Sequence, residues 1–127
     1  MKTIQLFSII LLLTAFLYVP VNGQGSTMEN IKSALKSGNA TALSPFFASK
    51  IDLILPDDED HVTPTVATKK LSEFFSQYQP TGFNQKHETV APNGAKCLIG
   101  ILNTSGGNFR TTVLVMNGKI EEIVIEN

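Results

Sequence analysis

The sequence predicts an α+β domain in which N-terminal helices pack on a mainly antiparallel sheet that ends in a four-stranded meander. Apolar residues at helical spacing dominate the middle of the chain. Turn signals then divide the C-terminal third into four runs rich in Val, Ile, Leu, Thr and Phe. Helices followed by consecutive strands are the element order of an α+β fold.

Two-residue turns are predicted to join the four strands of the meander. Asn-Gly and Gly-Gly suit such turns because both central residues need a positive φ, which a Cβ penalises. These pairs stand at Asn93-Gly94, Gly106-Gly107 and Asn117-Gly118. The strands between them are Phe83–Ala91, Lys96–Thr104, Phe109–Met116 and Lys119–Glu126.

The same turns predict the register and the composition of each sheet face. Without a bulge, one cross-strand row consists of His87, Gly100, Val113 and Glu122. The opposite face then carries Val90, Cys97, Ile99, Ile101, Arg110, Leu114, Met116, Ile123 and Ile125. Both faces are apolar, whereas a sheet with one wet face alternates apolar and polar residues. We therefore expect the helices to cover one face, and a partner or second layer to cover the other.

Residues 1–23 have the pattern of a secretory signal peptide. Lys2 precedes an apolar run, Ile4–Val21, which ends in small residues. We expect cleavage before Gln24, although the run is just long enough to serve instead as an uncleaved membrane anchor. Pro20 and the small residues favour cleavage. The expected mature protein is secreted or periplasmic and has no membrane segment.

Residues 24–127 form one predicted domain with a single modest core. Without Lys2 the chain has nine Lys and Arg against eleven Asp and Glu. Because it has no basic patch with interleaved aromatic residues, nucleic acid is not an expected partner. Cys97 is the only cysteine, so no internal disulfide can form.

Three helices and a short strand are predicted ahead of the meander. Ser26 and Glu29 form a capping box for a helix that Gly38 ends. Asn39 can cap a second, shorter helix that carries Leu43, Phe46 and Phe47, and Pro45 must kink or restart this helix. Ile51–Leu55 is a strand, and Thr63-Pro64 opens a third helix that ends before Pro80.

These elements resemble the nuclear transport factor 2-like superfamily and, within it, a small exported bacterial family, domain of unknown function 4783. The matching pieces are Ile31–Phe47, Asp52-Leu53, Leu55-Pro56, Phe74-Phe75, Pro80, Phe83, His87-Glu88, Ile99-Gly100, Leu102, Thr104, Gly107, Phe109-Arg110, Ile123 and Ile125-Glu126. The resemblance implies a curved sheet that wraps a long helix into a cone with a pocket. It implies no assigned activity.

His87 is the best candidate for chemistry. Opposite Gly100 it would have room beside its imidazole, with Glu122 further along the same row, and a His with a carboxylate can act as a general base. The structural alternative is a hydrogen-bonded histidine at the border of the sheet.

Three further residues are candidates for ligand binding. Asp52 could reach the pocket from the first strand, or it could simply cap or pair with a lysine. Arg110 could bind an anionic group, or it could pair with Glu126 or Asp52. Segment 57–61 is acidic, but it lacks the spaced pattern of a calcium-binding hand and is expected to be a solvated loop. We expect no metal and no cofactor.

Two functional hypotheses follow. The first is a non-catalytic exported domain that binds a small apolar ligand or a protein partner through its cone or a sheet face, and pairs as a homodimer through the sheet. The second is a cofactor-free isomerase or dehydratase with His87 as base. A cone filled by Phe46, Phe75 and Phe109 would favour the first hypothesis; polar groups converging on His87 would favour the second.

Overall fold

A computed structural model describes residues 26–127. The predicted signal peptide lies outside these residues. The helical elements are α3 (Ser26–Ser37), α4 (Ala40–Leu43), a 3-10 turn (Ser44–Phe46) and α5 (Pro64–Gln77). The strands are β1 (Phe47–Leu55), β2 (Asp58–Val62), β3 (Pro80–Val90), β4 (Lys96–Thr104), β5 (Gly107–Met116) and β6 (Lys119–Glu126). No helix in this part of the chain is long and apolar enough to cross a membrane.

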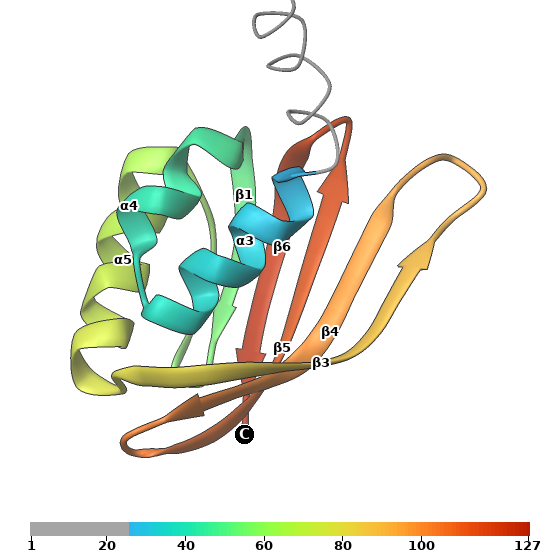
Figure 1. Cartoon of the computed structure of the whole chain (residues 1–127). Coiled ribbons are helices and arrows are strands. Elements are labelled where there is room, and N and C mark those ends of the chain that lie inside the picture. Colours follow the sequence, from blue (N-terminus) through green and yellow to red (C-terminus); the bar gives the residue numbers. More distant parts are fainter. Residues whose placement is uncertain (1–25) are drawn as a thin grey trace, which may run out of the picture.

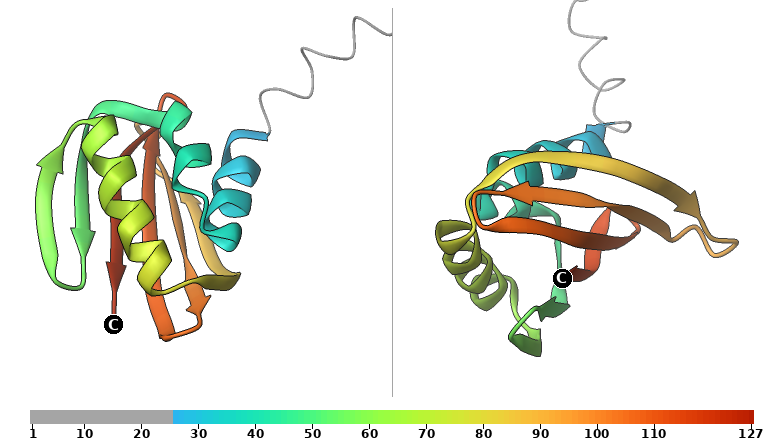
Figure 2. Two further views of the ribbon diagram at one scale, coloured as in Figure 1. Left: turned by 90° about the vertical axis from the view of Figure 1, so that its left-hand side faces the viewer. Right: turned by 90° about the horizontal axis from the view of Figure 1, so that it is seen from below.

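The strands form one curved six-stranded sheet in the order β2-β1-β6-β5-β4-β3. All neighbours are antiparallel except β1 and β6, which pair in parallel. Figures 1 and 2 show the sheet bending around α3, α4 and α5, which all lie on its inner side. The predicted α+β architecture and the four-stranded meander are confirmed.

Two elements near the start of the sheet differ from the prediction. The second helix ends before Phe47, which begins β1, because Pro45 tightens the chain into a 3-10 turn. Segment 58–62 is the edge strand β2 and not a loop, because it pairs with β1 residue by residue. Its charged side chains are compatible with an edge position, where they discourage pairing with another chain.

The predicted caps at Asn39, Thr63 and Gly38 are confirmed. Asn39 Oδ1 accepts a hydrogen bond from the Ala42 amide at 3.0 Å. The Thr63 hydroxyl accepts one from the Val66 amide, with Pro64 at the first helical position. Gly38 ends α3 with φ +67°.

The predicted register is wrong between β3 and β4 for two reasons. The connection is a three-residue loop with Gly94 at φ +89°, closed by a hydrogen bond from the Ala91 amide to the Ala95 carbonyl. A bulge at Lys86 then shifts the pairing again. His87 consequently lies opposite Ile99, and Gln85 lies opposite Gly100.

The rest of the predicted row is also displaced. The β4–β5 turn is centred on Ser105-Gly106, so Gly100 pairs with Thr111 and Leu98 with Val113. The Asn117-Gly118 turn forms as predicted, with φ of 53° and 74°. A bulge at Glu121 then pairs Val113 with Ile123 in place of Glu122.

The core fills the space between the helices and the inner face of the sheet. Its fully buried side chains include Ile31, Leu35, Leu43, Ile51, Leu53, Leu71, Leu98, Leu102, Val113, Ile120, Ile123 and Ile125. The Phe109 ring contacts the rings of Phe74 and Tyr78, with centroids 5.3 and 5.0 Å apart. Aromatic rings at this separation, in edge-to-face geometry, stabilise the fold beyond the contribution of the area that they bury.

Gly100 allows the edge strand to close over the core. A Cβ at this position would lie 2.5 Å from Phe83 Cζ and 2.7 Å from the Asn84 carbonyl oxygen. The ring of Phe83 therefore occupies the space that the missing side chain leaves.

We predict that Gly100→Ala lowers the free energy of unfolding by about 1–3 kcal/mol, because neither the ring nor the backbone oxygen can move away freely. Gly82→Ala is the matched control: its Cβ would meet only Asn103 Nδ2, at 3.6 Å, an ordinary contact. This control should be neutral or slightly stabilising. Chemical denaturation of both variants would test the prediction, and equal effects would contradict it.

Candidate functional site

The outer face of the sheet is the surface that the helices leave uncovered (Figure 1). Cross-strand partners share a face, so the register places its residues in rows. One row runs across the sheet through Glu59, Ile54, Val124, Thr112, Ile99 and His87. The next contains His61, Asp52, Glu122, Leu114, Cys97 and Thr89.

An apolar patch occupies the centre of this outer face. Its members are Ile54, Cys97, Ile99, Ile101, Leu114, Met116 and Val124, each half-buried. Ile99, Ile101 and Leu114 were expected on one face, and this is confirmed. Ile123 and Ile125 were assigned to the same face, and this is wrong: the bulge at Glu121 moves both into the core and brings Val124 outward.

His87 lies at the edge of the outer face and not in a pocket wall. Its side chain is exposed on β3, an edge strand. The space over Gly100, which was expected to hold the imidazole, is occupied by the Phe83 ring. The geometric argument for a general base beside Gly100 therefore does not apply.

Asp52 and Glu122 are brought together, as neighbours on β1 and β6. Within the described residues Asp52 pairs with a histidine and not with a lysine: its Oδ1 lies 2.5 Å from Nδ1 of His61. Arg110 is exposed, opposite Glu126 on β6. Among residues 26–127 neither Glu126 nor Asp52 lies within ion-pair distance of Arg110.

The interior of the cone is filled by aromatic side chains. Phe75 and Phe109 are 4% and 5% exposed, and Phe46 packs against the same core. A cone filled by these three rings is the arrangement that would favour the first hypothesis, binding without catalysis.

The acidic segment is partly neutralised by a lysine from α5. Lys70 Nζ forms ion pairs with Asp58 and Asp60. The pKa of Lys70 is raised above its usual value, mainly by the hydrogen bond to Asp58. The negative charge of Asp60 raises the pKa of Lys70 further. Nowhere in the described part of the chain do three or more His, Cys, Asp or Glu side chains converge as metal ligands.

Comparison with known proteins decides the family. The family model for a domain of unknown function, DUF4783, matches residues 28–126. The chain belongs to this family. A comparison with curated proteins found no match.

Solved structures agree with this DUF4783 fold. A family member from Bacteroides uniformis is 29% identical, with a TM-score of 0.72 over 78% of this chain and 94% of that one. Another, from Bacteroides fragilis, is also 29% identical, with a TM-score of 0.70 over 77% and 95%.

More distant structures carry the same fold at low identity. An NTF2-like protein of unknown function from Cytophaga hutchinsonii is 14% identical, with a TM-score of 0.57 over 78% of this chain and 84% of that one. A putative polyketide cyclase from Sinorhizobium meliloti is 10% identical, with a TM-score of 0.62 over 80% and 94%. Both likenesses show the NTF2-like fold alone.

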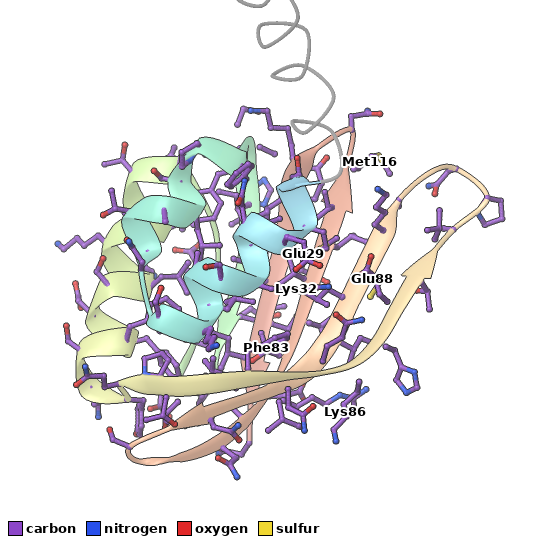
Figure 3. All side chains as sticks on the ribbon, in the orientation of Figure 1. Glu29, Lys32, Phe83, Lys86, Glu88 and Met116 are labelled. Carbon is purple, nitrogen blue, oxygen red and sulfur yellow. The ribbon has the colours of Figure 1, made fainter. Side chains whose placement is uncertain are left out.

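One polar contact of this DUF4783 domain was not anticipated from the sequence. Lys32 on α3 contacts Glu29 on the same helix at 3.4 Å and Glu88 on β3 at 3.0 Å (Figure 3). Burial lowers the pKa of Lys32, but the hydrogen bonds and charges of the two carboxylates outweigh it and raise that pKa. The Glu29 contact follows from the i, i+3 spacing, whereas no local pattern indicates the contact across the fold to Glu88.

Proposed function

We propose that this domain is exported and works as a non-catalytic binding module, in which the outer face of the sheet pairs with the same face of a second copy. The observation that carries the proposal is the apolar patch on β1, β4, β5 and β6. Contiguous exposed apolar surface of this kind is typical of an interaction site.

The outer face is large enough for a stable interface. Six strands about 4.8 Å apart and about eight residues long span roughly 29 by 26 Å. That area, about 750 Å², is close to the roughly 800 Å² that each partner contributes to a standard protein interface. Because the same surface is present on every copy, a second copy of the chain is the simplest partner, and the two copies would form a two-fold homodimer.

Charges at the margin of the patch are compatible with a two-fold arrangement. Asp52 and Glu122 give β1 and β6 an acidic edge, while Arg110 stands near the opposite end of β5. Antiparallel stacking of two sheets brings the Arg110 end of one copy toward the acidic edge of the other. The predicted ligand residues would then act on the partner chain, with His87 at the rim.

The packing of the interior favours a partner that binds at the surface of the domain. It leaves less room for a small apolar ligand inside the cone. The buried rings of Phe75 and Phe109 fill the space in which such a ligand would lie. The alternative enzyme hypothesis has less support, because His87 is exposed opposite Ile99.

We predict that Ile101→Lys and Leu114→Glu each convert the dimer to a monomer at tens of micromolar, because each places an unpaired charge in the centre of the interface. Val66→Glu is the matched control, since Val66 is 39% exposed on α5, on the other side of the sheet. Light scattering coupled to size exclusion gives the mass, and circular dichroism verifies folding. A monomeric unmodified protein, or folded patch variants that remain dimeric, would refute the proposal.

Export rests on the signal pattern of residues 1–23. We predict that the full-length chain, expressed in a Gram-negative host, accumulates outside the cytoplasm with Gln24 as its first residue. Intact-mass measurement of each cell fraction decides this. Recovery of the protein with Met1–Gly23 attached, in the cytoplasm or the inner membrane, contradicts it.

A further inference from the structure

A cleft separates the turn after β1 from the C-terminal half of α5. Its volume is about 240 Å³. Leu55 and Pro56 line it from the strand side, and Phe74 and Tyr78 line it from the helix. Figure 2 shows α5 beside the hairpin formed by β1 and β2. The cleft therefore has an apolar, partly aromatic wall.

The mouth of this cleft carries more negative charge than its surroundings neutralise. Three carboxylates line it, from Asp57, Asp58 and Glu73. Lys70 is the one cation in the lining, and its ammonium is already bonded to Asp58 and contacts Asp60. Within residues 26–127, no cationic group lies within ion-pair distance of Asp57 or Glu73. Two carboxylates at the mouth are thus available to a ligand.

We propose that the cleft binds one arginine side chain of a protein partner. Sites for small molecules usually measure about 300–1,000 Å³, so this cleft suits a single side chain better than a whole metabolite. An arginine has an apolar stem that can lie along Phe74 and Tyr78. Its planar guanidinium stacks on aromatic rings and bonds to carboxylates in a bidentate manner.

Lysine fits the same surface less well. Its ammonium is compact and strongly hydrated, and it cannot stack on a ring or bridge two carboxylate oxygens with a planar fork. An inorganic divalent cation fits less well still, because such ions need several converging oxygens and no such convergence is present in the described residues. The chemistry of the cleft therefore selects a guanidinium.

This cleft is separate from the apolar patch of the proposed dimer. It is built by α5 and the β1–β2 turn, whereas the patch lies on the face of the sheet that carries no helix. Arginine binding and dimer formation can consequently be tested independently, and the loss of one does not imply the loss of the other.

The test is a titration of the mature protein, labelled with ¹⁵N, with N-acetyl-arginine methylamide. We expect saturable shifts of the amide resonances of residues 55–58 and 73–78, with weaker binding at high salt because the rim charges are exposed. The lysine analogue should bind more weakly, and the norleucine analogue, which has the apolar stem without a charge, should cause no saturable shift. Shifts that are absent, spread over the whole surface or equal for arginine and lysine would overturn the proposal.

Three variants locate the site. Asp57→Asn and Glu73→Gln should each weaken binding of the arginine analogue by about two- to fivefold, the range of an exposed ion pair. Glu29→Gln removes the same charge from α3, where the Glu29 side chain is 70% exposed, and should leave the affinity unchanged. If all three variants weaken binding equally, the effect is net charge alone and the cleft is not the site. Light scattering on the same samples reports separately whether the dimer persists.

Discussion

The helices of the described chain all pack on one face of a sheet that is apolar on both faces. This constraint organises the rest of the structure. The inner face acquires a dense core, with side chains such as Leu98 and Val113 removed from water. The outer face retains half-buried aliphatic side chains with no covering layer from residues 26–127. Each buried aliphatic side chain contributes about 1.5–3 kcal/mol relative to its exposed state, so covering the outer face offers a large driving force for association.

The bulge at Glu121 decides which side chains belong to each face. In strict alternation from Ile120, Glu122 would point into the core, and Ile123 and Ile125 would point outward. The bulge leaves Glu121 unpaired and reverses the facing of every residue of β6 that follows it. It thereby keeps a carboxylate out of the core, which would be costly without a partner. The bulge at Lys86 likewise reverses the alternation along β3, so that His87 faces outward and Glu88 faces the helices, where it pairs with Lys32.

The architecture could be predicted from local patterns, and the register could not. Helical spacing, the caps at Asn39 and Thr63 and the Asn117-Gly118 turn depend on a few neighbouring residues, and all were identified correctly. The errors came from non-local effects. The first was a three-residue loop, where the Asn93-Gly94 pair indicated a two-residue turn. The others were the β4–β5 turn, which is centred on Ser105-Gly106 and not on the predicted Gly106-Gly107, and two single-residue bulges.

A signal for one of these bulges was present in the sequence. Two consecutive glutamates separate Ile120 from Ile123, and a spacing of three residues cannot keep both isoleucines on one face of a regular strand. The errors in the predicted register also affected the prediction of the candidate site. His87 was assigned to a pocket on the basis of a two-residue turn, and the three-residue loop pairs it with Ile99 in place of Gly100. Asp52 and Glu122 were selected as separate candidates, and the parallel pairing of β1 and β6 makes them neighbours.

Cys97 offers the most direct test of the central claim that the outer face is buried between two copies. It is the only cysteine of the chain, and it lies half-buried in the apolar patch beside Leu114. The measurement is the rate of maleimide labelling of Cys97 as the protein is diluted from tens of micromolar to nanomolar concentration. The account predicts slow labelling at high concentration and faster labelling on dilution, while the Ile101→Lys variant reacts at the fast rate throughout. A rate for the unmodified protein that does not change with concentration, and that equals the rate of the variant, would contradict it.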